Sequence, residues 1–367
     1  MDDLQQLRQA LSALDVQLLE MVANRQKIVA EIGRVKSAAG RGTRDFAREK
    51  VVLELARKTA VSAGLDASIG EELFRLLIRI SLAAQEQDMV MASDAGGGQR
   101  ALVIGGAGQM GQWFVRFLSS QGYEVEVCDP AGALPGYRHY THLGAQPLDQ
   151  ELIVVAAPVR ETIAILRQLA VLKPSGVIFD ISSVKGPLAE PIQELMAAGC
   201  QVTSIHPLFG PDVELLSGRN VIFVDIGDGQ ARERVRGLFA STMAEQVDMS
   251  LEAHDKVMAH VLGLSHAVNI AFFNALSQSG EDAGALARLS STTFDAQLDI
   301  AKHVAQENPY LYFEIQSLNE HSPRALFALL NAVTQVAGKV VDKDQQGLVE
   351  MMEKGKRFLE GRPETRP

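Results

Sequence analysis

The chain has 367 residues, of which 47% are hydrophobic, and 35 Lys and Arg against 45 Asp and Glu give a net charge of −10. This length allows two or three domains with buried cores, and the negative charge argues against general affinity for nucleic acid. Its apolar runs fall short of the roughly 18 residues that span a membrane, and its N-terminus lacks the basic and apolar regions of a signal peptide. Cys128 and Cys200 lie in apolar runs and are expected to be reduced core residues. We therefore expect a cytoplasmic enzyme with no membrane partner.

Residues 1–92 are expected to form an all-helical module. Apolar residues recur at alternating spacings of three and four up to Gly40–Gly42, which is the a/d pattern of one long helix. These seam residues are Leu4, Leu7, Leu11, Leu14, Leu18, Met21, Ile28, Ile32 and Val35. At 1.5 Å per residue such a helix is about 50 Å long, too long for a compact module of this size, so we expect it to span two subunits. Two further helices are predicted over Asp45–Ser62 and Asp66–Met91.

A cation interrupts this apolar seam. Arg25 occupies a seam position, where an unpaired buried charge would cost on the order of several kcal/mol. Lys36 lies only about 20° away around the same helix. An anion should therefore lie between the helices, either a carboxylate of the chain, such as Asp45 or Glu49, or a bound ligand. Arg8 faces elsewhere on its helix, which suits a residue that reaches into the site of a partner subunit.

The polar residues of this module resemble the all-helical chorismate mutase family. The resemblance rests on family spacing between Leu7-Arg8, Ser12–Asp15, Asn24-Arg25, Val35-Lys36, Arg44-Asp45, Arg48-Glu49, Ser81 and Gln85. It implies that Arg8 of the other subunit, Arg25 and Arg48 hold the two carboxylates of chorismate, with Ser81 on a carboxylate. Lys36 and Gln85 would bond the ether oxygen, and Asp45 and Glu49 the ring hydroxyl region. Such a rearrangement needs a dianion held in a compact conformer and charge stabilisation on the breaking C–O bond. The alternative is a module used only for dimerisation or regulation.

A glycine-rich stretch then predicts a dinucleotide site. Residues 93–99 read as a flexible linker, although a fixed loop remains possible. An apolar run at 101–104 feeds Gly106, Gly108 and Gly111 at the G-x-G-x-x-G spacing, and a helical segment and a second apolar run, Tyr123–Cys128, follow. Glycines allow the turn, the close approach to pyrophosphate and tight helix packing. Asp129 ends the second run, where an acid bonds the ribose hydroxyls and favours NAD over NADP.

Residues 100–250 are expected to form a Rossmann-type, doubly wound, mostly parallel sheet. Further strand-like runs lie at 152–156, 177–181, 202–205 and 221–224, and ligands gather beyond the carboxyl ends of such strands. Ser183 and Lys185 follow one run and are candidates to contact substrate or the nicotinamide ribose; a helix cap and a solvated lysine are the alternative. His206 follows another run. A neutral imidazole can accept a proton near pH 7, so His206 is a candidate catalytic residue, with a structural role as the alternative.

This region resembles the prephenate dehydrogenase family. The resemblance rests on three motifs in order: Gly-Gly-x-Gly-Gln-Met-Gly at 105–111, Ser-Val-Lys-Gly-Pro at 183–187 and His-Pro-Leu-Phe-Gly-Pro at 206–211. It implies that His206 bonds the ring hydroxyl of prephenate and promotes its deprotonation as hydride passes to NAD, with loss of CO2 to give 4-hydroxyphenylpyruvate. The residues implied to bind NAD are Gly106, Gly108, Gln109, Met110, Gly111 and Asp129. The scattered histidines predict no metal site.

Residues 251–367 are expected to form an all-helical dimerisation domain and complete a homodimer. Helices are predicted over 251–277, 294–304, 309–317, 323–341 and 345–359. By resemblance, His266 lies near the dehydrogenase substrate, although a buried core role is as plausible, and His254-Asp255 is explained most simply as a helix cap. Arg324 is assigned to the substrate carboxylate, although its spacing departs from the family pattern. By the same resemblance tyrosine is a candidate effector, for which the sequence predicts no site, and prephenate and arogenate are both open as the dehydrogenase substrate. A non-enzymatic NAD sensor is the remaining alternative.

Overall fold

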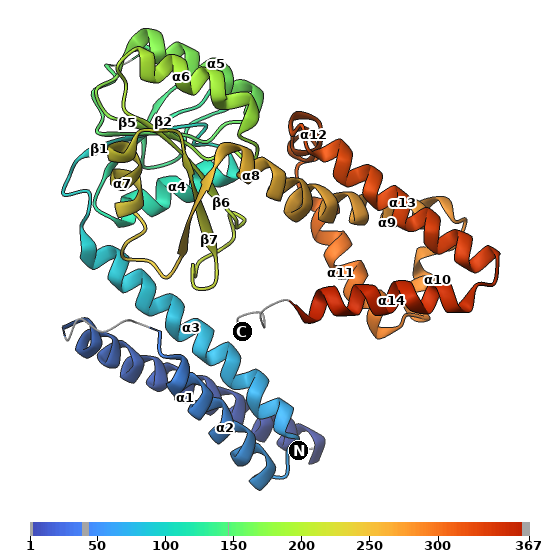
Figure 1. Ribbon diagram of the computed structural model, residues 1–367. Coiled ribbons are helices and arrows are strands. Elements are labelled where there is room, and N and C mark those ends of the chain that lie inside the picture. The colour runs from blue at the N-terminus through green and yellow to red at the C-terminus, as the bar shows by residue number, and fades with distance from the viewer. Residues whose placement is uncertain (1–2, 39–43, 146, 362–367) are drawn as a thin grey trace. The chain divides into compact units, whose positions relative to one another are not determined.

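The computed structural model describes residues 3–38, 44–145 and 147–361 (Figure 1). It contains two compact units. One consists of Met1–Thr141, Pro207–Val221 and Glu233–Val247, and the other of His142–His206, Ile222–Arg232 and Asp248–Pro367. The chain passes between the units several times, so they do not follow the boundaries predicted at 92 and 250. The three-domain division therefore stays a prediction from sequence.

The N-terminal module has the three predicted helices. They are α1 (Asp3–Ala38), α2 (Phe46–Ser62) and α3 (Ala67–Ser93), drawn in blue in Figure 1. Asp45 begins α2 because its carboxylate accepts the backbone N–H of Arg48, and Asp66 begins α3 in the same way through Ser68. The predicted break at Gly40–Gly42 lies outside the described residues.

The apolar seam of α1 is exposed in the single chain. Leu7 is 68% exposed and Val35 is 70% exposed, and the other seam residues are exposed as well. One face of α3 has the same character, with Ile69, Leu73, Leu76 and Ile80 all exposed. An apolar surface of this extent normally marks an interaction site. The exposure agrees with a helix whose apolar side is completed by another subunit.

The central region forms one eight-stranded sheet. Its strands are β1 (Arg100–Ile104), β2 (Glu124–Cys128), β3 (Arg138–Tyr140), β4 (Leu152–Val155), β5 (Val177–Asp180), β6 (Val202–Pro207), β7 (Asn220–Asp225) and β8 (Glu245–Ser250). The order is β3-β2-β1-β4-β5-β6-β7-β8. The pairs β1–β2, β2–β3, β4–β5 and β5–β6 are parallel, with Ala101 opposite Val125 and Asp180 opposite Ser204. Strand order reverses beside β1, as in doubly wound folds.

Short helices accompany these strands. They are α4 (Gln109–Ser120), α5 (Val159–Leu172), α6 (Ala189–Ala197) and α7 (Gly229–Gly237), with a 3-10 turn at Gly186–Leu188. The helix predicted after the glycines is α4, whose Trp113 stacks on Phe117 with ring centroids 4.7 Å apart. Phe117 in turn stacks on Phe239. This aromatic cluster fixes the helix that begins at the glycine loop.

The segment predicted as a flexible linker is a fixed loop. Asp94 ends α3 in the left-handed conformation, and Gly96 N–H donates to the Gln121 carbonyl at 2.8 Å. Gly98 N–H donates to the Gly122 carbonyl at 3.0 Å. A side chain at Gly96 would collide with the backbone of Tyr123. The glycines in this loop therefore serve close backbone contact, which is the second alternative drawn from the sequence.

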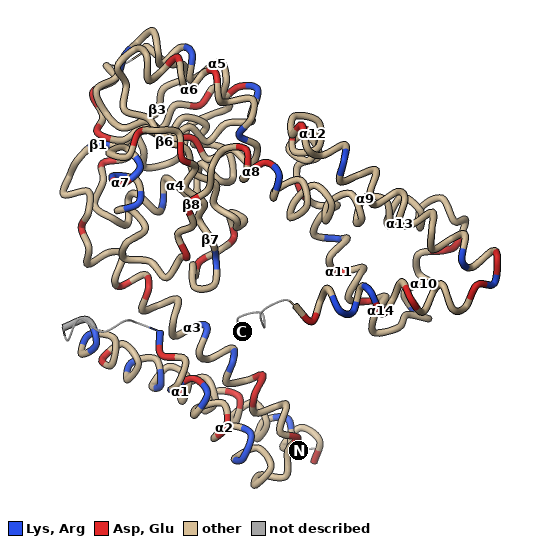
Figure 2. The backbone as a smooth tube through the Cα atoms, viewed as in Figure 1, with Lys and Arg blue, Asp and Glu red and all other residues tan. Residues whose placement is uncertain are grey.

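The C-terminal part is helical, as predicted. It begins with α8 (Leu251–Met258), a π-helical segment (Ala259–Leu264) and α9 (Ser265–Gln278). It continues with α10 (Ala283–Arg288), α11 (Thr292–Gln306), α12 (Pro309–Leu318), α13 (Ser322–Val341) and α14 (Gln345–Glu360). Figure 2 shows how little charge α9 and α13 carry: α9 has no Lys, Arg, Asp or Glu, and α13 has only Arg324 and Lys339.

Two apolar helical stretches correct one expectation. Leu251–Gln278 and Ser322–Val341 are long and apolar enough to cross a membrane by length and composition, and only 22% and 6% of their apolar windows are buried. The expectation that no run reaches this length counted uninterrupted apolar residues, whereas these helices are apolar on average with polar residues spaced along them. Length and composition do not distinguish a lipid-facing helix from one that packs on a protein partner.

Candidate active sites

The glycine loop after β1 is shaped to receive a phosphate group. A Cβ on Gly106 would lie 2.7 Å from Cγ1 of Val127, and one on Gly111 would collide with the Gly105 carbonyl oxygen. Gly108 is the N-cap of α4, and because it has no side chain it makes no side-chain capping bond to the first turn of the helix. The N–H groups of such a turn form an anion site, helped by the helix dipole. The loop therefore fits the pyrophosphate of a dinucleotide.

Asp129 is tied to this loop. It lies just after β2 and is 6% exposed, and its Oδ2 accepts the Ala107 N–H at 2.9 Å. Its Oδ1 accepts the Ala131 N–H at 2.8 Å. These bonds hold a carboxylate beside the glycines, where it can accept ribose hydroxyls and would repel a ribose phosphate. Gln109 and Met110 form the first turn of α4.

Gly111→Ala tests the loop. The new methyl group would force the Gly105 carbonyl and α4 apart, so we expect dinucleotide affinity to fall by about tenfold or more, since 1.4 kcal/mol is a factor of ten. Titration of nucleotide against intrinsic fluorescence measures it. Gly229→Ala is the matched control, because nothing lies within 4 Å of an added Cβ there. Equal affinity in both variants would show that the loop does not hold the nucleotide.

A second cluster surrounds His206, the predicted catalytic histidine on β6. Its side chain is buried, with the residue 3% exposed, and its Nδ1 lies 2.9 Å from Nε2 of His254 on α8. Nδ1 of His254 lies 2.7 Å from Oδ1 of Asp255. Backbone N–H groups of Lys185 and Gly186 donate to the two oxygens of Asp255 at 2.9 and 2.7 Å. A buried carboxylate and two imidazoles therefore stand in line.

This role of His254 and Asp255 was not predicted from the sequence. Helix capping was the expected explanation, and it is wrong, because Ser250 caps α8 by accepting the Ala253 N–H. The carbonyl of Asp255 also accepts the side-chain amide of Asn319 at 2.8 Å. The adjacent histidine and aspartate at a helix start were the only signal in the sequence. Their partner His206 is 48 residues away, so only tertiary structure reveals the arrangement.

Lys185 is fully buried, which was not expected from the sequence. It was predicted to contact substrate or the nicotinamide ribose, or else to be solvated, but its side chain is 0% exposed. Its Nζ donates to Oδ1 of Asp180 and to the Ile205 carbonyl, both at 2.7 Å. The ammonium thus joins β5 to the strand residue just before His206. Ser183 is half-buried and caps no helix, and its contact with substrate stays a prediction.

Burial sets the protonation of this cluster. It lowers the pKa of His206 well below 6.5, and the nearby His254 and Lys185 lower it further. Burial also lowers the pKa of His254 despite its bond to Asp255. Burial alone would raise the pKa of Asp255, but hydrogen bonds from His254, Lys185 and Gly186 outweigh it and lower the pKa. At neutral pH both imidazoles are therefore uncharged and Asp255 is ionised.

The remaining dehydrogenase candidates lie on the C-terminal helices. His266 lies in the first turn of α9, where burial lowers its pKa to about 4, and the centroid of its ring lies 4.2 Å from that of Tyr312. Within the described part of the chain, Nδ1 of His266 is buried with no hydrogen-bond partner. Arg324 is exposed in the first turn of α13. The predicted contacts of both residues with substrate stay predictions.

In the helical module, the structure brings together Arg25, Ser81 and Gln85, which we call the Arg25 cluster. Nη1 of Arg25 donates to Oγ of Ser81 at 2.6 Å and to the Leu77 carbonyl at 3.2 Å. Nε2 of Gln85 donates to the Val29 carbonyl at 2.9 Å. Among the described residues, no carboxylate pairs with Arg25, so the internal carboxylate expected as one alternative is not found. Burial lowers the pKa of Arg25, which favours a bound anion as its partner.

Other predicted mutase residues lie around α1 and α2. Lys36 is half-buried near the end of α1, while Arg8, Asp45 and Arg48 are exposed. Glu49 forms a bidentate ion pair with Arg44, with N–O distances of 2.9 and 3.1 Å. Arg44 also donates a hydrogen bond to Ser217 Oγ. Among the described residues, none of Arg8, Asp45 and Arg48 is hydrogen-bonded to the Arg25 cluster. The predicted contacts of these residues with chorismate stay predictions.

Glu86, beside Gln85, was not singled out from the sequence. It is 3% exposed and accepts the Leu216 N–H at 2.6 Å and the Met243 N–H. Burial raises its pKa, and the two backbone bonds oppose that rise. Glu86 thus connects α3 to the segment between β6 and β7 and to the segment between α7 and β8, in agreement with the fixed loop at 93–99.

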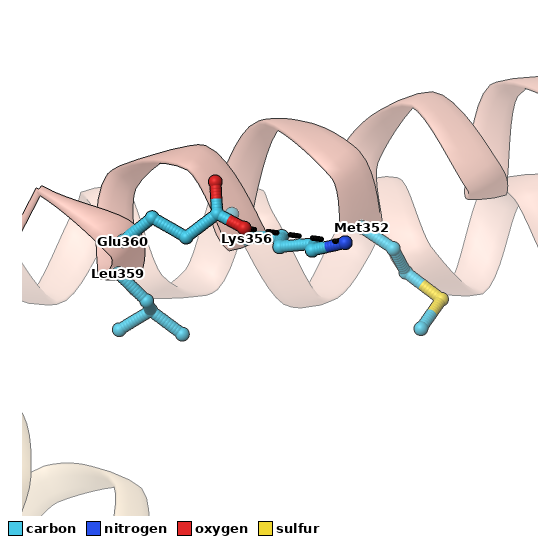
Figure 3. A pocket seen from close by; sticks show the side chains of 5 residues that line it. Met352, Lys356, Leu359 and Glu360 are labelled. Atoms are coloured by element: carbon cyan, nitrogen blue, oxygen red, sulfur yellow. Dashed lines mark ion pairs between the residues drawn. The ribbon is translucent and has the colours of Figure 1, made fainter.

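One surface hollow contains none of these residues. Figure 3 shows it along α14, lined by Met352, Gly355, Lys356, Leu359 and Glu360. Lys356 and Glu360 form an exposed ion pair at 4.0 Å. A shallow surface on one helix with a paired charge offers no converging polar groups for a small ligand.

The fold and sites define a nucleotide-dependent oxidoreductase preceded by a helical module with a cationic cluster. Three family descriptions match consecutive segments: chorismate mutase type II at 7–86, the prephenate dehydrogenase nucleotide-binding domain at 144–247 and its dimerization domain at 250–354. A 4-amino-4-deoxyprephenate dehydrogenase of Streptomyces pristinaespiralis is 30% identical over 67% of this chain and 86% of its own. The chain belongs to the prephenate dehydrogenase family, with a type II chorismate mutase domain ahead of the dehydrogenase.

Further relatives span nearly the whole chain. A T-protein of Enterobacter agglomerans is 27% identical over 94% of this chain and 89% of its own. A prephenate dehydrogenase of A. aeolicus, solved with hydroxyphenyl propionate and NAD+, shares the fold with a TM-score of 0.56 and 21% identity, over 71% of this chain and 96% of that one. The chain thus combines an isomerase and an oxidoreductase.

Two features gain meaning from these matches. The glycine loop lies between the first two matched segments, so its assignment rests on its own geometry and on the fold. Both apolar stretches that pass the length test for a membrane span lie inside the dimerization match at 250–354. Their exposed apolar faces are therefore those of a domain family that pairs subunits.

Proposed function

We propose that this chain converts chorismate to prephenate and then oxidises prephenate to 4-hydroxyphenylpyruvate with NAD, using His206 as the base. The observation that carries the proposal is the buried imidazole of His206, whose Nδ1 is engaged by His254 and whose Nε2 has no hydrogen-bond partner among the described residues, so that it is left for a substrate hydroxyl. The T-proteins of Enterobacter agglomerans and Haemophilus influenzae, similar along most of the chain, support the pairing of activities.

The mutase step needs position and charge only. Arg25, held by Ser81 and the Leu77 carbonyl, would bind one carboxylate of chorismate. Lys36 and Gln85 would bond the ether oxygen as the C–O bond breaks, and a preformed ammonium and amide stabilise that charge without reorganisation. Arg8 of the second subunit and Arg48 would hold the remaining carboxylate. Holding the dianion compact accounts for the rest of the acceleration.

The dehydrogenase step needs a base and a hydride acceptor. Bound NAD supplies the hydride acceptor, and the glycine loop with Asp129 would hold it. Nε2 of His206 takes the proton of the ring hydroxyl while hydride leaves the ring carbon that bears this hydroxyl. The ring carboxylate then departs as CO2, and its electron pair completes the aromatic ring. The proton on His206 returns to the phenolate oxygen, which restores the neutral imidazole.

Two separate assays test the proposal. Purified protein is given chorismate without NAD, and prephenate with NAD or NADP. We expect chorismate loss in the first assay and NADH with 4-hydroxyphenylpyruvate in the second, with NAD preferred because Asp129 repels a ribose phosphate. Dehydrogenation without chorismate loss would reduce the helical module to dimerisation or regulation. If no NADH forms, the protein is a nucleotide sensor and not a dehydrogenase. Adding tyrosine to both assays tests whether tyrosine is an effector.

We also propose that the protein is a cytoplasmic homodimer. Its apolar α13 supports this, since Phe327, Leu330 and Val333 are 66%, 57% and 58% exposed. Two buried free cysteines agree with a reducing compartment. Leu330→Asp with Val333→Asp is expected to raise the dimer dissociation constant about 100-fold, since each buried side chain contributes roughly 1.5 kcal/mol. Light scattering over a dilution series measures it, with Gln335→Asp on the same helix as control. Unchanged dimerisation would place the interface elsewhere.

A further inference from the structure

A line of hydrogen bonds ends at the imidazole that we assign as the base. Asp255 Oδ1 lies 2.7 Å from Nδ1 of His254, and Nε2 of His254 lies 2.9 Å from Nδ1 of His206. His206, His254 and Asp255 are all buried, at 3%, 0% and 3% exposure. The two imidazoles are tilted at 59°, with ring centroids 5.1 Å apart, so they meet edge to edge through these nitrogens rather than by stacking.

The carboxylate of Asp255, at the end of this line, determines which nitrogen of each imidazole carries a hydrogen. Both oxygens of Asp255 already accept backbone N–H groups, from Lys185 and Gly186, so the carboxylate acts only as an acceptor. Nδ1 of His254 must therefore carry the hydrogen. A neutral His254 then has a bare Nε2, which can only accept, so Nδ1 of His206 must carry its own hydrogen. A neutral His206 is left with a bare Nε2.

We propose that His254 and Asp255 are positioning residues that lock His206 in the tautomer with a bare Nε2, the form that can take the substrate proton. This inference rests on the proposed dehydrogenase function. The opposite tautomer would present an N–H to the hydroxyl and could not act as a base. Without the hydrogen bond to His254, a neutral His206 could adopt both tautomers. Only the part of the protein with a bare Nε2 could then accept the substrate proton.

The charges around His206 agree with this role. The groups that face the two imidazoles are Lys185 and Asp180, joined at 2.7 Å, and Asp255. Lys185 and Asp180 cancel each other, so Asp255 leaves one net negative charge in the buried cluster. When His206 takes a proton, the cluster becomes neutral, and the bond from its Nδ1–H to His254 becomes charge-assisted. Asp255 thus stabilises the imidazolium without receiving the proton itself.

A pair of substitutions at His254 tests the lock. His254→Phe fills a similar volume but accepts no hydrogen bond. We expect kcat with prephenate to fall about 100-fold while KM changes little, because the share of the competent tautomer falls and the imidazolium also loses its charge-assisted bond. His254→Gln offers a carbonyl oxygen near the position of Nε2 and should restore kcat to within about tenfold of the wild type. Chorismate turnover, which uses the separate helical module, serves as the internal control. An unchanged kcat in His254→Phe would overturn the proposal.

A spectroscopic measurement decides the tautomer without any turnover. In protein labelled with 15N-histidine, the His206 signals are assigned by their loss in His206→Asn. We expect Nδ1 of His206 to carry the hydrogen in the wild type and both tautomers to appear in His254→Phe. A wild-type hydrogen on Nε2 would overturn the proposal even if His254→Phe proved too unstable to purify. If the wild type shows the expected tautomer but does not turn over prephenate, the proposed function is refuted and the tautomer proposal is not. The measurement therefore separates a failure of one from a failure of the other.

Discussion

His206→Asn is expected to lower kcat with prephenate by about 10²- to 10⁴-fold, which is the range that a positioned general base contributes. The amide nitrogen of Asn can take the place of Nδ1 and still donate to His254, so the buried line of hydrogen bonds is preserved. What is lost is Nε2, the atom that we propose as the acceptor of the hydroxyl proton. The measurement is NADH formation from prephenate, and chorismate loss in the same preparation shows that the protein is folded. Turnover within about tenfold of the wild type would remove His206 from the mechanism.

The pH dependence of the same step follows from the pKa of His206. Burial first, and then His254 and Lys185, lower this pKa well below the ordinary 6.5. The base therefore stays neutral in mildly acidic solution, and kcat/KM for prephenate should fall only at a pH below 6.5. The stability of the folded protein should decrease in the same direction of pH as kcat/KM. The unfolded chain binds more protons than the folded one below pH 6.5, so the free energy of unfolding decreases as pH falls from there toward the folded pKa. An acid limb centred at 6.5 or higher would contradict this account.

Lys36→Ala and Gln85→Ala are expected to abolish most mutase activity and leave the dehydrogenase intact. Removing one preformed donor from a developing oxyanion costs about 10²- to 10³-fold in rate. Gln85 is buried against α1, where its side chain lies within 3.5 Å of a Cβ built on Gly33, and Lys36 is half-buried one turn further along. Lys27→Ala and Gln87→Ala are matched controls, because both side chains are exposed on the same helices.

The readouts are chorismate loss and NADH formation from added prephenate. The expected pattern is a selective loss of the first. Unchanged chorismate consumption in both variants would support a module that only pairs or regulates subunits. Loss of both activities would indicate that the helical module supports the dehydrogenase structurally, which the contacts of Glu86 with Leu216 and Met243 make physically reasonable.

Strong periodicity made much of the fold predictable. The a/d pattern, the helical patterns from Asp45 and from Asp66 and the glycine spacing correctly predicted α1 to α4 and β1. Two strands were missed for physical reasons. β3 has only three residues, and β8, Glu245–Ser250, is a polar strand at the end of the sheet without the buried apolar run that marks the others. α10 was missed because a helix of six residues covers fewer than two turns.

The sites were predictable in residue type more than in role. Arg25 stood out by its place in the apolar seam, and the resemblance to the chorismate mutase family added Ser81 and Gln85; the structure brings these three together. The burial of Lys185 was not predicted, because a lysine is normally solvated and nothing local shows that Asp180 and the Ile205 carbonyl would bury it. The line from Asp255 to His206 depends on an α8–β6 contact, which no local pattern encodes.

The most direct test of the whole account is one reaction with chorismate as the only carbon substrate. Purified protein receives chorismate and NAD, and NADH, CO2 and 4-hydroxyphenylpyruvate are followed with time. We expect all three products in equal amounts, their formation lost in Lys36→Ala and restored there by added prephenate. Chorismate that is consumed without NADH, or NADH that fails to form from either substrate, would contradict an enzyme whose helical module supplies the substrate of its own dehydrogenase.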